Sequence, residues 1–337
     1  MIRFVIALSL LLLCMTSCTS DRAPEAVQPG APPGSDPALV AVTQRINANP
    51  ERADLYAERA VLQYDKENFD GAIADLQRAL SIDSTNVEYH WNLAEVYLDY
   101  YRSRLALRTL ERAVALDPDN LESQLRLAEI QLITQQYDDA ISSVNQATRI
   151  DQRNPEAYYL LAQIFAETGD TARAVKAAEE ATQIDPDMTD AYLYLGKLFA
   201  AQNNPRAERY YDAAIGINPN DTYALHSKGD YLRDRDRISE AIEYYRRASL
   251  ADRQYVAGHF NAGLLLMELD SVEQARREFD ITVKNDPLHI RGFFFRGYAS
   301  ELLGETAAAR SDYERALRMA PDYELALEGL QRVNAGK

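Results

Sequence analysis

Eight alanines recur along this chain at a nearly constant spacing of 34 residues, and this spacing constrains the fold more than any other feature. They are Ala72, Ala106, Ala140, Ala174, Ala207, Ala241, Ala275 and Ala309, with one step of 33 residues between Ala174 and Ala207. Seven residues after each of them stands a second column: Ala79, Ala113, Ala147, Ala181, Ala214, Ala248, Thr282 and Ala316. Eleven or twelve residues before them stands a third: Ala60, Ala94, Ala128, Ala162, Gly196, Gly229, Gly263 and Gly297. A chain with this period folds as a solenoid of stacked repeats.

The small side chains predict that each repeat is a pair of closely packed antiparallel helices. They let the two helices, and then neighbouring hairpins, approach without overpacking. One such hairpin cannot bury enough apolar surface to offset its conformational entropy, so the repeats must stack. We expect helix N-caps at Asn86, Asn120, Asn154 and Asp221. Tight turns are expected at Gly169 and Gly304.

Two further columns complete the pattern. Prolines end the predicted second helices at Pro118, Pro186, Pro219, Pro287 and Pro321. A large residue stands fourth in seven of the repeats: Tyr56, His90, Tyr158, Tyr192, Leu225, His259 and Phe293. With these columns the chain resembles the tetratricopeptide repeat (TPR) family. The resemblance implies an all-α fold, a right-handed α-solenoid of about eight helix-turn-helix repeats with a C-terminal capping helix.

The same pattern divides the chain into segments. We expect a signal peptide at 1–17, a Pro/Gly-rich tether at 18–37 and the helix of an N-terminal half-repeat at 38–52. The eight repeats cover 53–323, as 53–86, 87–120, 121–154, 155–188, 189–221, 222–255, 256–289 and 290–323. Residues 324–337 are the expected capping helix and tail.

The N-terminus has the layout of a bacterial lipoprotein signal peptide. Arg3 precedes an apolar run from Val5 to Leu13, which is too short to span a bilayer. The residues Met15-Thr16-Ser17-Cys18 resemble a lipobox, which makes Cys18 the predicted lipidation site. The alternative is an ordinary secretory signal that releases a soluble periplasmic protein. Because Cys14 would leave with the signal, lipidation of Cys18 would leave no free thiol and no disulfide.

These features predict a location in the cell envelope. Thr19 follows Cys18 where an aspartate would resemble an inner-membrane retention signal, so we expect an outer-membrane lipoprotein. The array would face the periplasm, with exposure on the outer surface as the alternative.

Composition and motifs exclude several classes of function. The formal net charge of −16 opposes binding to nucleic acid. The chain has no Gly-rich phosphate loop, no His-Glu-x-x-His motif and no Cys-x-x-Cys pair, so we expect no enzyme activity, no cofactor and no metal. His226 and His259, on adjacent repeats, lack a third ligand for zinc.

The candidate site is a column one residue after the large one. It comprises Ala57, Trp91, Leu125, Tyr159, Leu193, His226, Phe260 and Phe294. The resemblance implies that this column lies on the first helices and lines a concave groove, which could receive a peptide or a partner helix. The alternative is that these residues only pack between first helices. Nearby polar and aromatic residues could set specificity: Asn92, Arg126, Tyr194, Asn261 and Arg291. Asp230 argues against a clamp for a C-terminal carboxylate.

Two hypotheses for function follow. The first is a membrane-anchored scaffold that binds a protein or peptide partner in its concave groove. The second is a structural spacer, or a regulator of an envelope hydrolase, which acts through its acidic convex face. The sequence leaves open which partner binds, which process is served and whether the chain forms oligomers.

Lipidation can be tested directly. Growth with radioactive palmitate should label the wild-type protein, and Cys18→Ser should abolish the label because it removes the acylated thiol. Label retained by Cys18→Ser, or an unlabelled wild type, would contradict the prediction.

Overall fold

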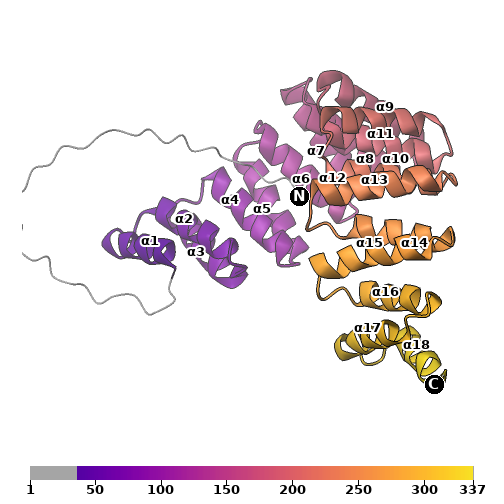
Figure 1. The fold of residues 1–337 in the computed structure, drawn as a ribbon. Coiled ribbons are helices and arrows are strands. Elements are labelled where there is room, and N and C mark those ends of the chain that lie inside the picture. Colours follow the sequence, from indigo (N-terminus) through magenta and orange to yellow (C-terminus); the bar gives the residue numbers. More distant parts are fainter. Residues whose placement is uncertain (1–35, 337) are drawn as a thin grey trace, which may run out of the picture. The chain divides into compact units, whose positions relative to one another are not determined.

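The computed structural model describes residues 36–336, and within this range the chain forms 18 helices and no strand (Figure 1). The described residues divide into two compact units, residues 36–83 and residues 84–336. In the first unit the described helices are α1 (Pro37–Ala48), α2 (Ala53–Tyr64) and α3 (Phe69–Ile82). The all-α class predicted from the sequence is confirmed for this part of the chain.

The second unit contains the remaining helices. They are α4 (Val87–Asp99), α5 (Ser103–Leu116), α6 (Leu121–Ile133), α7 (Tyr137–Ile150), α8 (Pro155–Glu167), α9 (Thr171–Ile184), α10 (Thr189–Ala201), α11 (Arg206–Ile217), α12 (Thr222–Arg233), α13 (Ile238–Ala251), α14 (Ala257–Glu268), α15 (Val272–Asn285), α16 (Ile290–Leu302), α17 (Thr306–Met319) and α18 (Glu324–Ala335). The first helix of each hairpin begins at the repeat start read from the sequence, except that α14 begins one residue later.

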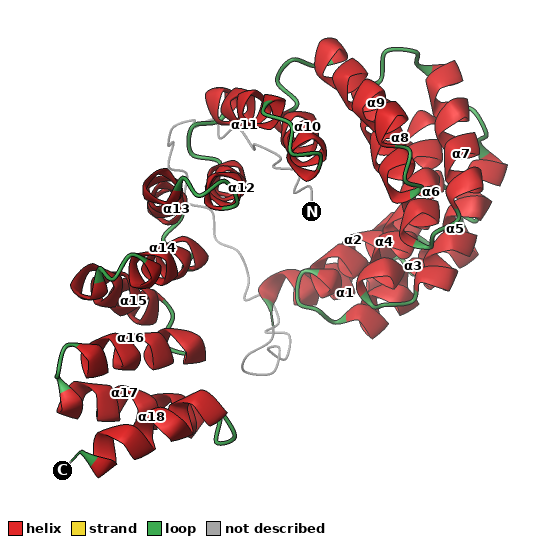
Figure 2. Ribbon diagram, turned by 90° about the vertical axis from the view of Figure 1, so that its right-hand side faces the viewer, coloured by secondary structure: helices red, strands yellow, loops and turns green. Residues whose placement is uncertain are grey.

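Helices that are consecutive in sequence pack against each other throughout this second unit. The hairpins follow one another in a row, with α10, α12 and α14 on one side and α11, α13 and α15 on the other (Figure 2). The last helix, α18, packs against α17 and α16. Each hairpin therefore buries its apolar faces against its neighbours, as a stacked repeat must.

The predicted helix caps are confirmed. The side chains of Asn86, Asn120, Asn154 and Asp221 each accept a hydrogen bond from the backbone N–H three residues later, at distances of 2.8–3.1 Å. Pro155 occupies the first position of α8. Its missing N–H costs nothing there, because that group has no partner within a helix.

One turn residue in every hairpin has a left-handed backbone. These residues are Glu67, Tyr101, Gln135, Gly169, Asn203, Asp236, Asp270 and Gly304, with φ between 54° and 80°. Only two of the eight are glycines, so the repeats hold side-chain-bearing residues in a conformation that costs about 1–2 kcal/mol each. The packing of the two helices outweighs this cost.

All three small-residue columns are buried between helices. The third column shows a size exchange that explains its change from alanine to glycine. Where the first helix carries Gly196, Gly229, Gly263 or Gly297, the second helix presents Tyr211, Tyr245, Phe279 or Tyr313. A Cβ added to Gly263 would lie 2.5 Å from Cε1 of Phe279. Glycine is therefore required by the aromatic ring opposite it.

Buried charges in the array are paired across helices. Glu278 of α15 accepts hydrogen bonds from His259 Nδ1 of α14 at 2.7 Å and from Arg246 Nε of α13 at 2.8 Å. Burial disfavours the charged form of Glu278, but these two partners outweigh burial and hold the pKa of Glu278 below its ordinary value. His259 Nδ1 is thus held by Glu278.

The predicted signal peptide, Cys18 and nearly all of the tether lie outside the described residues. No helix in residues 36–336 combines the length and the apolar character needed to cross a membrane.

The glycine–aromatic pairing predicts opposite effects for two substitutions. Gly263→Ala should destabilise the protein by about 1–3 kcal/mol, because the new methyl group overpacks against Phe279. Gly216→Ala, in α11 with open space around the added Cβ, should stabilise it by about 0.5–1 kcal/mol. Urea unfolding followed by circular dichroism measures both midpoints. Equal midpoints for the two variants would contradict the packing argument.

Candidate partner-binding surface

Apart from Ala57, which lies on α2 in the first unit, the predicted site residues lie on the first helices of the second unit, and we call the surface that they form the first-helix wall. Trp91 and Asn92 come from α4, Leu125 and Arg126 from α6, Tyr159 from α8, Leu193 and Tyr194 from α10, His226 from α12, Phe260 and Asn261 from α14, and Arg291 and Phe294 from α16. They divide into residues that build the wall and residues that solvent can reach.

Four of the predicted residues are buried and build the wall. Leu125, Leu193, Phe260 and Phe294 pack between helices, and Phe260 contacts the rings of Phe279 and Phe295. These four side chains have the packing role that the sequence analysis kept as its alternative. Substituting one of them would change the packing of the array, so a loss of binding in such a variant would not identify a contact with a partner.

Trp91 is half-buried at the start of the second unit. Its Nε1–H donates a hydrogen bond to Ser123 Oγ of α6 at 2.9 Å. The guanidinium of Arg126 lies 5.5 Å from the Trp91 ring and also pairs with Glu122. The indole is therefore held in one orientation with part of its surface available to solvent.

Two tyrosines continue the wall onto α8 and α10. The rings of Tyr159 and Tyr194 meet edge to face, with centroids 5.7 Å apart. Burial, with the nearby carboxylate of Asp190 as a second cause, raises the pKa of Tyr159 to about 12. Burial also raises the pKa of Tyr194, so both hydroxyl groups stay neutral at physiological pH and can donate hydrogen bonds.

A polar cluster lies at α12 and α14. The Nε2 atom of His226 lies 3.4 Å from Asn261 Nδ2 and 3.6 Å from Asp230 Oδ2. Burial lowers the pKa of His226, and Asp230 only partly opposes this shift. Tyr245 donates a 2.6 Å hydrogen bond to Asp230, which Arg233 also contacts. The neutral imidazole keeps a buried Nδ1 atom without a partner.

The wall ends on α16. The guanidinium of Arg291 lies 4.9 Å from the Phe260 ring and 5.9 Å from the Phe295 ring, so its charge sits over an aromatic surface. Arg291 is exposed and shares this surface with the half-buried Phe295.

The sequence analysis missed one exposed aromatic residue of the wall. Tyr223 is 52% exposed at the start of α12, and its hydroxyl contacts Lys197 Nζ of α10. The signal was present in the sequence. Tyr223 stands second in its repeat, where the five preceding repeats carry an acid: Asp54, Glu88, Glu122, Glu156 and Asp190. The acid is absent from this position in the last three repeats, which carry Tyr223, Ala257 and Arg291.

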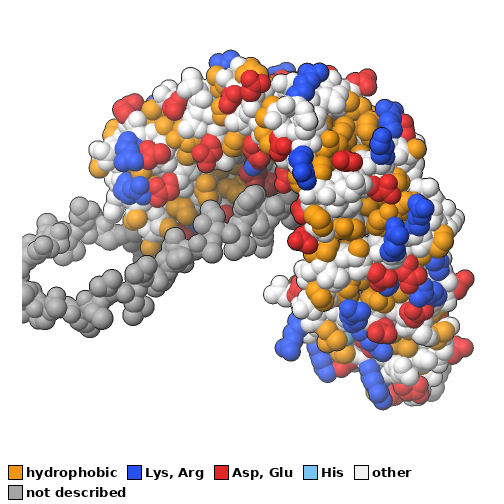
Figure 3. Space-filling view, turned by 90° about the horizontal axis from the view of Figure 1, so that it is seen from above, with side chains coloured by type: hydrophobic (Ala, Val, Ile, Leu, Met, Phe, Trp, Pro, Cys, Tyr) orange, Lys and Arg blue, Asp and Glu red, His pale blue; other side chains and the backbone are white. Residues whose placement is uncertain are grey.

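The wall has the chemistry of a binding surface. Aromatic faces, amide groups and hydroxyl groups can stack on and hydrogen-bond to a peptide. Within residues 36–336 no group of three or more His, Cys, Asp or Glu side chains is placed to hold a metal ion. Figure 3 shows hydrophobic, acidic and basic side chains interspersed on the face that it presents.

Stacked helical hairpins of this kind define a scaffold for protein–protein interactions. Family models described as tetratricopeptide repeat match residues 101–164, 159–222, 197–255 and 260–324, and a model described as TPR repeat matches residues 60–99. The chain belongs to the tetratricopeptide repeat family.

One curated relative is similar to part of the array. Protein O-mannosyl-transferase TMTC1 of the mouse (Mus musculus) is 28% identical over 112 residues, which are 33% of this chain and 12% of that protein. Because this chain matches only 12% of that protein, we assign no activity to this chain from the relative.

Solved structures with helical repeats are also similar. MamA is 24% identical with a TM-score of 0.44, over 50% of this chain and 93% of that chain. YrrB, described as a TPR protein with an unusual peptide-binding site, is 26% identical with a TM-score of 0.43. The match covers 57% of this chain and 99% of that chain. A chain of the APC/C hetero-tetramer Cut9–Hcn1 is 17% identical with a TM-score of 0.47. The match covers 88% of this chain and 58% of that chain. These scores are all below 0.5, and the family assignment rests on the sequence models and the helices.

The raised pKa of Tyr159 is testable. At pH 10 a tyrosine with the ordinary pKa is about half ionised. Tyr159 should remain almost fully neutral there, since burial disfavours its phenolate. The Cζ chemical shift of ¹³C-labelled tyrosine, assigned by loss of the signal in Tyr159→Phe, reports the ionised fraction. Half-ionisation at pH 10 would show that the ring is not buried as described.

Proposed function

We propose that this protein is a membrane-anchored scaffold of the bacterial cell envelope that holds a peptide or helix of a partner protein on the first-helix wall. The TPR array is the scaffold, and the N-terminal sequence is the basis for the anchor. Outer-membrane attachment with the array in the periplasm is the location that we propose.

The observation that carries the binding proposal is the run of partly exposed aromatic and polar side chains on successive first helices. Trp91, Tyr194 and Tyr223 offer aromatic faces, while Asn261 and Arg291 offer hydrogen-bond donors. Since Leu193 and Phe260 beneath them are buried, these faces are held on a rigid base. A rigid aromatic surface binds with a small loss of conformational entropy, which favours binding.

The anchor rests on a separate observation. A short apolar run followed by Ser17-Cys18 supports export and lipidation of the chain. The Pro/Gly-rich residues that follow have the composition of a tether, which would hold the array away from the membrane.

The binding proposal predicts which substitutions abolish partner capture. Pull-down from an envelope extract with the purified full-length chain should recover a partner, and Trp91→Ala with Tyr223→Ala should reduce its recovery about tenfold or more. The matched control is Leu250→Ala, because Leu250 is 73% exposed on the second helix α13. It should leave recovery unchanged.

Two outcomes would contradict this proposal. Capture that survives the double substitution would exclude the first-helix wall. Capture that is lost only when exposed acids of second helices are reversed, as in Glu111→Lys with Glu314→Lys, would favour the acidic face and with it the spacer or hydrolase-regulator hypothesis.

A further inference from the structure

Charge is distributed unevenly over the helices of the second unit. The first helices α4, α6, α8 and α10 together carry eight acidic and two basic residues, a net charge of −6. The second helices of the same repeats, α5, α7, α9 and α11, carry seven acidic and eight basic residues, a net charge of +1. The later first helices α12, α14 and α16 carry three acidic and four basic residues. The excess of acid is therefore confined to one half of the first-helix wall.

All eight acids stand at three positions of the repeat, the second, the ninth and the thirteenth. An α-helix turns by about 100° per residue, so the ninth and thirteenth positions point within about 20° of the second. The predicted site residues of these helices stand at the fifth and sixth positions, about 60° to one side of this direction and about 40° to the other. The acids therefore form a stripe along the wall, which we call the acidic stripe.

Most of the acidic stripe has no cation of its own. Arg126 pairs with Glu122, and Lys197, the other basic residue of these four helices, contacts the hydroxyl group of Tyr223. Carboxylates that lie close together repel one another, so a cationic ligand would relieve this repulsion as well as form new pairs. Within residues 36–336, six exposed acids of the stripe form no ion pair: Glu88, Glu95, Glu129, Glu156, Glu167 and Asp190.

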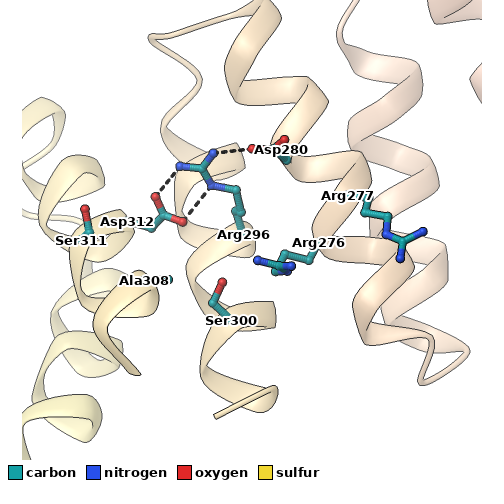
Figure 4. Close-up of a pocket in the computed structure, with 8 residues that line it drawn as sticks. All are labelled: Arg276, Arg277, Asp280, Arg296, Ser300, Ala308, Ser311 and Asp312. Carbon is teal, nitrogen blue, oxygen red and sulfur yellow. Dashed lines mark hydrogen bonds and ion pairs between the residues drawn. The ribbon is translucent and has the colours of Figure 1, made fainter. Parts of the chain in front are cut away.

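A cleft in the last repeats shows the opposite situation, in which charges are balanced within the molecule. The cleft lies among α15, α16 and α17 and has a volume of about 350 Å³. There Arg296 donates to Asp312 at 2.8 and 2.6 Å and to Asp280 at 2.8 Å (Figure 4). The six acids of the stripe have no such partner in the described part of the chain, so their charge is available to another molecule.

Stabilisation of helix ends accounts for only part of the acidic stripe. Four of its acids lie in the first turn of their helix, where a negative charge faces the positive end of the helix dipole. Glu95 and Glu129 lie seven residues further along, beyond the reach of this effect. Glu167 is the last residue of α8, where the dipole disfavours an anion. The helix dipole therefore gives these three carboxylates no stabilising role.

Aromatic rings border the acidic stripe. Trp91 follows Glu88 by three residues and precedes Glu95 by four, so the three side chains lie on one face of α4. Burial first, and the carboxylate of Asp190 second, raise the pKa of Tyr159, which places that carboxylate near the ring. A lysine or arginine side chain can pair with a carboxylate here and at the same time lie over a ring.

The charges also indicate where such side chains come from. The tether does not supply them, because residues 18–35 carry one basic residue, Arg22, and two acidic ones, Asp21 and Glu25. A second copy of this chain is disfavoured as the occupant by its net charge of −16. A basic segment of a different protein complements the stripe.

We propose that the half of the first-helix wall formed by α4, α6, α8 and α10 selects a basic segment of the partner protein. Its lysine or arginine side chains pair with the acidic stripe and lie over the rings of Trp91 and Tyr159. This inference rests on the proposed function, since it names the chemistry of the segment that the wall holds.

The probes are three synthetic peptides of equal length, without aromatic residues, that carry lysine, glutamine or glutamate at the same alternate positions. Fluorescence of Trp91, the sole tryptophan of the chain, reports binding to the full-length protein, and calorimetry gives the dissociation constant. The Lys peptide should bind with a dissociation constant on the order of 10 μM at about 50 mM salt, about tenfold tighter than the Gln peptide. The Glu peptide should not bind, and about 300 mM salt should weaken binding of the Lys peptide by screening the charges.

Two double variants separate the acidic stripe from general attraction to an acidic protein. Glu95→Gln with Glu129→Gln should weaken binding of the Lys peptide about fivefold or more, because it removes two exposed carboxylates that have no role at a helix end. The matched control is Glu111→Gln with Asp138→Asn, which removes the same charge from exposed positions on the second helices α5 and α7. The control should bind as the wild type does. Circular dichroism checks that both variants keep their helices.

Tighter binding of the Lys peptide that only the stripe variant weakens would support the proposal. Equal binding of the Lys and Gln peptides, no binding of the Lys peptide, or equal effects of the two double variants would overturn it.

Failure of the proposed function gives a different result. Capture of the envelope partner that Trp91→Ala with Tyr223→Ala abolishes, but Glu95→Gln with Glu129→Gln leaves unchanged, would overturn the selection of a basic segment and keep the wall as the binding surface. Capture that survives Trp91→Ala with Tyr223→Ala would reject the wall itself.

Discussion

The close approach of the two helices in each hairpin is the constraint on which the rest of the structure depends. At the point where the two helices come closest, a side chain of the second helix points at the first helix. The first helix must carry a small residue there. In the last four repeats glycine faces an aromatic ring, whereas the first four repeats carry alanine in that column and have Leu76, Leu110, Val144 or Ala178 at the position of the ring. Where the second helix carries a large ring, the first helix lacks a methyl group, because overpacking at a close helix contact is destabilising.

This packing also creates the candidate partner-binding surface. Each first helix uses one column, with Leu193 and Phe260 as examples, to pack against its neighbours, and this fixes the direction of the columns beside it. Tyr194, Tyr223 and Asn261 are partly exposed as a consequence. The wall is therefore a product of the stack, and its chemistry can change from repeat to repeat while the fold is kept.

The sequence located the site by column but could not separate buried members from exposed ones. Trp91 and Phe260 stand in the same column, yet Trp91 is half-buried and Phe260 is enclosed by Phe279, Phe295 and His289. These neighbours come from positions 19–35 residues away, so a local pattern does not reveal them. Tyr223 was overlooked for a related reason. The second position of the repeat carries an acid in the first five repeats, which indicates a solvated position, and Tyr223 replaces the acid only in the sixth.

The sequence by itself determined the period, the helix starts, the caps and the family, because each depends on spacing or on a residue's contact with its own backbone. The tertiary structure alone decided which aromatic ring faces each glycine, which charged groups pair and where a cleft opens. Arg246 and Glu278 are 32 residues apart, and nothing local indicates that they pair. Contacts between helices depend on how whole repeats stack, and only the folded chain brings those side chains together.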